Sequence, residues 1–318
     1  TAGLSLATDI APEPSRPRVV AFLYVMLMLG MMVSALVFGA ALANFSEMRL
    51  IQVVQGAALT GMALNIVALW KQEARDPSLT SPARERPRFK DSWRKFQEAG
   101  GSLRVLLALG LGTAGFTMQD ILLEPYGAEI LHLTVSETTA LTALFAAGTL
   151  AGFAISARRL GRGADPYRIA AMGALVGLAA FSAIIFSAPL MSPALFRLGA
   201  TLIGFGGGLF AVGTLTAAMA LAKDGASGLA LGTWGAVQAT ASGAAIAGGG
   251  AIRDVMSALA AEGHLGAALA TRATGYTIVY HIEIALLFAT LAVIGPLVRT
   301  RHPARQDKLK FGLVEFPG

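Results

Sequence analysis

The chain has 318 residues, of which 55% are hydrophobic and 14% are charged, against about 25% charged residues in an average soluble domain. That composition excludes an ordinary soluble protein and predicts an all-α membrane protein with several spans. Cysteine is absent, which excludes disulfides and thiolate metal sites. No residue spacing indicates another metal site or a hydrolase triad.

Apolar stretches of about 20 residues, the length that crosses a bilayer as a helix, occur eight times. The predicted spans cover residues 19–42, 50–70, 104–124, 137–157, 168–190, 194–222, 227–252 and 274–298. They predict four parts, which are the end of an N-terminal helical half (1–70), a basic cytoplasmic linker (71–103), a C-terminal six-helix half (104–298) and a cytoplasmic tail (299–318).

Two spans before a long basic loop and six after it resemble the layout of a major-facilitator-type helical bundle, which has six spans in each half. The first two spans would then be the last two of the N-terminal half, and the earlier N-terminal spans would be missing. The start of the chain agrees with this expectation, because residues 1–7 read as the end of an apolar segment.

Basic residues predict the orientation of the chain in the membrane. Twenty of the 25 lysines and arginines fall on both visible ends and on one set of alternate loops, whereas only Arg49, Arg253 and Arg272 fall on the opposite set. Because basic loops stay on the cytoplasmic side, both visible ends are predicted to be cytoplasmic. The net charge of +6 therefore reflects the basic residues of the cytoplasmic loops, and no nucleic-acid partner is expected.

The second part of the linker, at residues 88–96, has the pattern of an amphipathic helix. Its aromatic residues recur on one helix face and basic residues flank them; the set is Phe89, Trp93 and Phe96 with Arg88, Lys90, Arg94 and Lys95. Such a helix fits the surface of an anionic lipid leaflet. A helix that docks on a partner protein would show the same pattern.

The third span closes with the stretch QDILLEPYG at residues 119–127. Asp120 and Glu124 stand four residues apart and are expected to share one helix face, with Pro125 ending the helix. Carboxylates at the end of a span are costly unless they face protein, water or a ligand. The alternative is that both already lie in the headgroup zone, where acidic side chains are tolerated.

Other intramembrane residues allow several interpretations. His281, about two turns into the last span, could pack through a hydrogen bond, contact a bound ligand or lipid, or relay a proton. Trp234 in the seventh span could stack on a planar ligand or pack in the core. The glycines of GFGGG at 204–208 and those at 243 and 248–250 are predicted to allow close helix packing. A phosphate-binding loop is disfavoured for GFGGG, because no strand precedes it.

Several stretches together resemble the PucC/LhaA family, the bacteriochlorophyll-delivery branch of the major facilitator superfamily. They include YVMLMLGMMVSALVFGA, NIVALWKQEARD, GLGTAGFTMQDILLEPYGAEIL and the tail KLKFGLVEFPG, and the similarity covers essentially the whole chain. The loop AISARRLGR at 154–162 keeps part of a facilitator loop signature, but Arg158 replaces its acidic residue. That replacement argues against an ordinary alternating-access cycle.

The resemblance implies a non-enzymatic, chaperone-like factor that assembles light-harvesting complexes in the bacterial inner photosynthetic membrane. It implies bacteriochlorophyll as cofactor, with carotenoid or lipid as further candidates. The implied partners are the α/β polypeptides of LH1 or LH2, or a reaction centre–antenna complex, together with membrane lipid. The candidates for pigment contact or a docking edge are His281, Asp120, Glu124, Gln119 and Trp234.

Two alternative functions stay open. One is a proton-coupled secondary transporter of a small solute, with Asp120 or Glu124 as the protonation site. The other is a permanent structural subunit of a photosynthetic complex. Transport driven by a pH gradient would distinguish the first alternative, and copurification at fixed stoichiometry from mature membranes would distinguish the second.

Overall fold

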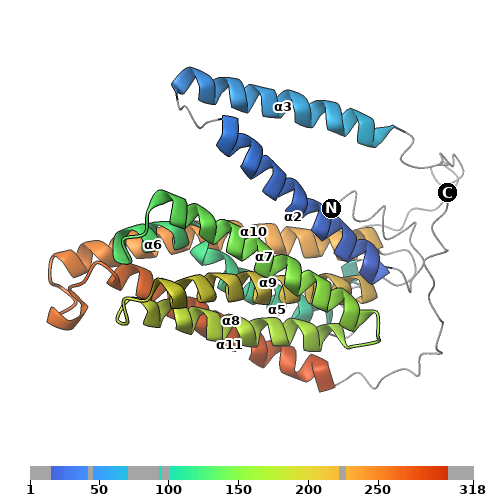
Figure 1. Cartoon of the computed structure of the whole chain (residues 1–318). Coiled ribbons are helices and arrows are strands. Elements are labelled where there is room, and N and C mark those ends of the chain that lie inside the picture. Colours follow the sequence, from blue (N-terminus) through green and yellow to red (C-terminus); the bar gives the residue numbers. More distant parts are fainter. Residues whose placement is uncertain (1–15, 42–45, 71–92, 95–100, 222–226, 300–318) are drawn as a thin grey trace, which may run out of the picture. The chain divides into compact units, whose positions relative to one another are not determined.

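The computed structural model describes residues 16–41, 46–70, 93–94, 101–221 and 227–299, and the secondary structure in these ranges is helical (Figure 1). The chain divides into two units, one of residues 24–95 and the other of residues 1–23 together with 96–318. Of the predicted amphipathic segment, only Trp93 and Arg94 are described, and both are helical. Its other residues lie outside the described ranges.

Helix α3 (Glu47–Leu69) belongs to the smaller unit, and α2 (Arg16–Ala41) crosses the boundary between the units. Helix α3 begins after Ser46, whose side chain accepts a hydrogen bond from the Arg49 N–H at 3.1 Å and so satisfies a donor of the first turn. The two helices coincide closely with the first two predicted spans.

The larger unit is a helical bundle built around α9 (Figure 1). Helix α9 packs along both α7 and α8, α11 packs against α5 and α8, and α10 packs against α5 and α11. The described elements of this unit are α5 (Ser102–Thr117), η3 (Met118–Ile121), α6 (Leu123–Ile130), α7 (Val135–Leu160), α8 (Pro166–Ser187), α9 (Pro193–Leu221), α10 (Ser227–Ala261), η4 (Ala267–Leu269) and α11 (Thr274–Arg299).

Local sequence sets where the long helices begin. A capping box starts α7, in which the Thr134 side chain accepts from the Glu137 N–H while the Glu137 carboxylate accepts from the Thr134 N–H at 2.9 Å. Asp165 starts α8 by accepting from the Tyr167 N–H at 3.1 Å, and Pro166 follows at the first helical position. These signals explain why the observed starts lie within two residues of the predicted ones.

Glycines bring α9 close to both of its main neighbours. A Cβ atom at Gly204 would lie 2.1 Å from the Phe145 carbonyl oxygen, and one at Gly206 would lie 2.8 Å from the Gly173 carbonyl oxygen. Close packing is therefore confirmed for GFGGG. In α10 the prediction holds at Gly249, where a Cβ would lie 2.9 Å from the Met118 carbonyl oxygen, but not at Gly243 or Gly248, where an added Cβ would meet no described atom within 4 Å.

Within the described residues, five helices are long and apolar enough to cross a membrane, namely Glu47–Leu69, Ala140–Leu160, Pro166–Ser187, Pro193–Ala220 and Thr274–Val298. The bent pair Ser102–Ile121 and Leu123–Ile130 would make a sixth span. The chain is therefore an all-α, multi-pass membrane protein. The number of eight spans is not confirmed, although α10 covers the predicted range 227–252 and α2 covers the range 19–42 up to residue 41.

The third predicted span is broken. Helix α5 ends at Thr117, η3 continues as a tighter 3-10 turn, and α6 then departs at 44°. Pro125 does not end the helix, because it lies in the first turn of α6, where the missing proline N–H has no helical partner to lose. The expectation that Asp120 and Glu124 share one continuous helix face is wrong, because the break separates them.

Candidate functional site

A carboxyl group from α11 stabilises the break between α5 and α6. Glu283 is fully buried, and its Oε1 accepts a hydrogen bond from the Gln119 N–H at 2.8 Å. A break within a membrane span requires new partners for the backbone groups that leave the helix, and Glu283 supplies one. Its Oε2 has no hydrogen-bond partner among the described residues. Glu283 was not among the predicted site residues, although a lone carboxyl in the run IVYHIEIALLF was a usable signal.

Gln119 and Asp120 lie side by side in η3 but have different surroundings. Gln119 is buried, and its Nε2 donates to the Phe116 carbonyl oxygen at 3.2 Å and to Asp120 Oδ1 at 2.6 Å. Asp120 lines a cavity of about 160 Å³ between α5, α7, α9 and α10. The amide thus orients the carboxylate at the cavity wall.

The rest of the QDILLEPYG stretch anchors α6 to its neighbours. Glu124 is exposed, and its Oε1 accepts a hydrogen bond from the Thr142 hydroxyl of α7 at 2.7 Å. Tyr126 is fully buried, with ring centroids 5.4 Å from both Phe196 and Tyr276. Glu124 therefore contributes a contact between α6 and α7, and Tyr126 is part of the aromatic core.

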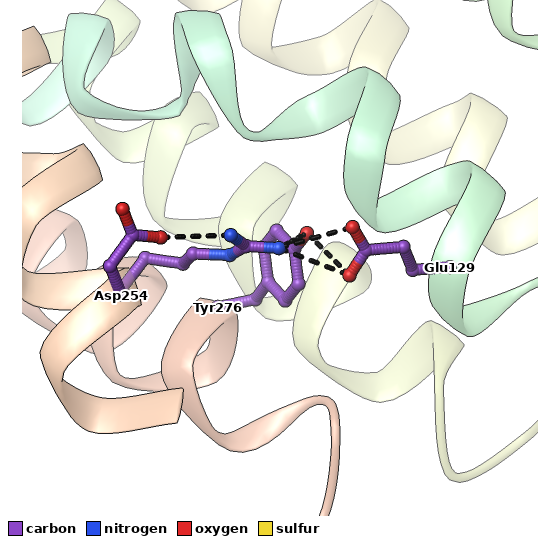
Figure 2. Close-up of polar contacts among 4 residues, drawn as sticks. Glu129, Asp254 and Tyr276 are labelled. Carbon is purple, nitrogen blue, oxygen red and sulfur yellow. Dashed lines mark hydrogen bonds and ion pairs between the residues drawn. The ribbon is translucent and has the colours of Figure 1, made fainter. Parts of the chain in front are cut away.

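An ion-pair network joins α6, α10 and α11 at the far end of the broken span. Figure 2 shows Glu129, Asp254 and Tyr276 converging on the guanidinium group of Arg253. Arg253 lies 3.0 Å from Glu129 Oε2 and 2.8 Å from Asp254 Oδ1, and the Tyr276 hydroxyl donates to Glu129 at 2.9 Å. The guanidinium also lies over the Tyr276 ring, 4.5 Å from its centroid. The network holds α6 in place after the break.

His281 and Trp234 have opposite environments. Trp234 is 5% exposed, which favours the core-packing interpretation. The His281 side chain is exposed on α11, and its Nδ1 lies 2.7 Å from the Thr277 carbonyl oxygen. Because a carbonyl oxygen can only accept, Nδ1 is the donor in this contact, and in the neutral imidazole Nε2 then keeps its lone pair. His281 is therefore not packed inside the bundle.

The other three histidines provide weaker evidence for a ligand site. His132 and His264 are exposed in loops, and His264 Nδ1 lies 3.2 Å from Glu262 Oε2. His302 lies outside the described residues. Within the described part of the chain, no group of three histidine, aspartate or glutamate side chains could hold a metal ion. Of the five predicted candidates, Gln119 and Asp120 are hydrogen-bonded to each other, whereas Glu124, Trp234 and His281 lie in other surroundings, so the five do not form one site.

Comparison with known proteins identifies the family. The family model described as "PUCC protein" matches residues 1–302. A Rhodobacter capsulatus relative described as "Uncharacterized protein in puhA-bchM intergenic region" is 50% identical over 100% of this chain and 67% of its own length. "Protein PucC" of Cereibacter sphaeroides is 45% identical (96% of this chain, 66% of the relative), and "Protein PucC" of Rhodovulum sulfidophilum is 51% identical (80% and 57%). The chain thus spans about two thirds of the length of the curated relatives it matches. By the family match and by these identities, the chain belongs to the PUCC protein family.

Proposed function

We propose that this chain acts in a membrane assembly factor for bacterial light-harvesting antenna complexes, and that it binds bacteriochlorophyll and docks the antenna α/β polypeptides. Membership of the PUCC protein family supports a role in the photosynthetic membrane. The proposed role is non-enzymatic, because holding and presenting a pigment and its polypeptides changes no covalent bond.

The observation that supports the proposal most directly is the hydrogen bonding and exposure of the His281 ring. Its Nδ1–H donates to the Thr277 carbonyl oxygen, so Nε2 points its lone pair away from that bond on an exposed side of α11. Histidines that ligate metals are commonly oriented in this way, with the second ring nitrogen donating to a backbone carbonyl. Bacteriochlorophyll supplies a Mg²⁺ ion with an open axial position, and His281 fits the role of its ligand.

The surface beside His281 suits a flat apolar ring. Ala285 and Phe288 follow at the fourth and seventh positions and are also exposed, Phe288 to 59%. On a helix these positions lie on the same face. The small side chain of Ala285 leaves space next to the imidazole, and Phe288 provides an apolar boundary. This His281 face, made of His281, Ala285 and Phe288, supports pigment contact at the outside of the bundle.

The size of the cavity at Asp120 favours the outer face over the interior. Its volume of about 160 Å³ is below the roughly 300–1,000 Å³ of typical small-molecule pockets. A bacteriochlorin macrocycle with its side chains is a large ligand and would not be enclosed there. Transient binding on an open face also suits a factor that must release its pigment to another protein.

The test is a mild-detergent pull-down of the full-length protein from a phototrophic host, with an absorption spectrum and identification of copurifying small proteins. We expect near-infrared absorbance and antenna polypeptides with the unaltered protein and with His264→Ala, which removes an exposed loop histidine. His281→Leu should lose the pigment absorbance, while His281→Asn should keep part of it because an amide oxygen can also ligate Mg²⁺.

Two outcomes would contradict the proposal. Absence of pigment from the unaltered protein, together with normal antenna assembly in a deletion strain, would refute the whole proposal. Equal pigment in His281→Leu would remove His281 as the ligand. Recovery of antenna polypeptides at fixed stoichiometry from mature membranes would favour the permanent structural subunit instead.

One observation favours the transporter alternative, namely that the exposed carboxyl group of Asp120 lines a cavity between α5, α7, α9 and α10. A proton-coupled transporter would show uptake into vesicles driven by a pH gradient, and Asp120→Asn would abolish it. The assembly-factor proposal expects no such uptake.

A further inference from the structure

The cavity at Asp120 has a chemistry distinct from that of the His281 face. It lies between α5, α7, α9 and α10, and three phenyl rings, of Phe116, Phe145 and Phe210, form much of its apolar wall. No lysine, arginine or histidine is among the described residues that line it. The one ionisable side chain on the wall is the carboxyl group of Asp120.

Hydroxyl groups on the wall present acceptors to the cavity. The Thr117 hydroxyl donates its proton to the Thr113 carbonyl oxygen at 2.9 Å, and the Thr214 hydroxyl donates to the Phe210 carbonyl oxygen at 2.9 Å. A hydroxyl has one proton and two lone pairs. Once the proton is used within the helix, only acceptor capacity remains for a ligand. These hydroxyls and Asp120 therefore present oxygen lone pairs to the cavity, and the side-chain amide of Gln238 on the same wall offers both an acceptor and donors.

The carboxyl group of Asp120 adds to this preference. Its Oδ1 accepts from the Gln119 side chain at 2.6 Å, which fixes its orientation, and a carboxylate keeps further lone pairs for other donors. A ligand that pairs with Asp120 must carry positive charge or donate hydrogen bonds. An anionic ligand would meet Asp120 with no cationic side chain to balance it.

Aromatic rings extend the same preference to the apolar part of the wall. Phe116 and Phe210 both line the cavity, and their ring centroids lie 5.7 Å apart with planes inclined at 41°. The face of an aromatic ring attracts a cation, most strongly where water is excluded, and this is how proteins recognise quaternary ammonium groups. The volume of about 160 Å³ is about five times the ~30 Å³ of a liquid water molecule, which limits the occupant to a small group.

We propose that this cavity binds a small organic cation, a quaternary ammonium or protonated amine group, held by Asp120 and the phenyl rings. Such a group can come from a free amine or from the headgroup of a choline- or ethanolamine-containing lipid. Neither His281 nor its neighbours on α11 line the cavity, so this site is independent of pigment binding.

The first test measures choline binding to the purified full-length protein in a choline-free detergent by calorimetry. Choline chloride should bind, and 3,3-dimethyl-1-butanol, which has the same shape without the charge, should bind much more weakly. Asp120→Asn should weaken choline binding by roughly tenfold to a hundredfold, the loss expected for a charged partner. Phe145→Leu, at a partly exposed position, should weaken it by about threefold to thirtyfold.

Glu262→Gln is the matched control, because Glu262 is an exposed carboxylate just after α10, outside both the cavity wall and the Arg253 network. It should bind choline as the unaltered protein does. Equal choline affinity in Asp120→Asn, or equal affinity for the uncharged analogue, would overturn the proposal even if pigment still copurifies.

A second arm identifies the source of the cation. Thermal unfolding is followed while phosphatidylcholine or phosphatidylglycerol is added to the detergent solution. Stabilisation by phosphatidylcholine that requires Asp120, with no effect of free choline, would indicate a lipid headgroup. Stabilisation by free choline would indicate a soluble amine. Stabilisation by neither, in agreement with absent calorimetric binding, would overturn the proposal.

Discussion

The buried contact between Glu283 and the broken span gives a sharp prediction about stability. Two substitutions separate the role of the oxygen acceptor from that of the acidic group. Glu283→Gln keeps an oxygen at the position of Oε1 and so can still accept from the Gln119 N–H, whereas Glu283→Leu keeps the approximate volume and removes the acceptor. We therefore expect the two variants to differ strongly although both remove the carboxyl.

The magnitude follows from the burial of both partners. Glu283 has no exposed surface and Gln119 is 2% exposed, so water cannot replace the lost acceptor in Glu283→Leu. A buried N–H without a partner costs about 1–3 kcal/mol. Glu283→Gln leaves that bond in place and puts its amide nitrogen where Oε2 already lacks a partner, so it avoids the cost of an unpaired Gln119 N–H. The expected difference between the variants is therefore about 1–3 kcal/mol.

The assay is reversible unfolding of the purified protein in mixed micelles by increasing denaturing detergent, followed by circular dichroism. Thr290→Val is the control, because the buried Thr290 hydroxyl of the same helix donates only within α11, to the Leu286 carbonyl oxygen at 2.7 Å. It should cost less than Glu283→Leu. The reasoning is refuted if Glu283→Gln destabilises as much as Glu283→Leu, since the acceptor oxygen would then be irrelevant.

Two further predictions concern packing and capping. Gly204→Ala should destabilise by about 1–3 kcal/mol in the same unfolding assay, because its Cβ would meet the Phe145 carbonyl oxygen at 2.1 Å; Gly243→Ala, with open space, should be neutral or stabilising, and equal effects would contradict the packing argument. Hydrogen bonds from Thr134 lower the pKa of Glu137 below its usual 4.5, so Glu137 contributes stability above about pH 4.5 that is lost as pH falls through its folded-state value. Glu137→Gln should therefore show a shallower loss of stability in acid than the unaltered protein, and a pH-independent difference between the two would refute this.

Helix positions were largely predictable because both the apolar lengths and the capping signals are local. The predicted span at 274–298 and α11 (Thr274–Arg299) differ by one residue at one end, and the span at 194–222 matches α9 (Pro193–Leu221) to within one residue at each end. The orientation of these spans in the membrane stays a prediction. So do the domain boundaries and the role of the segment at 88–96.

The broken span was not predictable from local signals. Pro125 suggested a helix end at that point, but proline is tolerated in the first turn of a helix, and the break lies earlier, at 118–122. The group that stabilises the break, Glu283, is 164 residues away in sequence. Sequence periodicity carries no information about such a contact, although an isolated carboxyl in an apolar run does indicate that some partner exists.

The contacts of the QDILLEPYG region determine which experiments can separate function from folding. Asp120 faces a cavity and Glu124 bonds to α7; Tyr126 fills the aromatic core, and Glu129, two residues beyond the stretch, joins the Arg253 network. A change at Tyr126 or Glu129 would disturb helix packing and any bound ligand together. His281 differs, because its hydrogen bond stays within α11 and its ring is exposed. A loss of pigment in His281→Leu with unchanged unfolding would therefore report on ligation alone, which makes it the cleanest test of the proposed function.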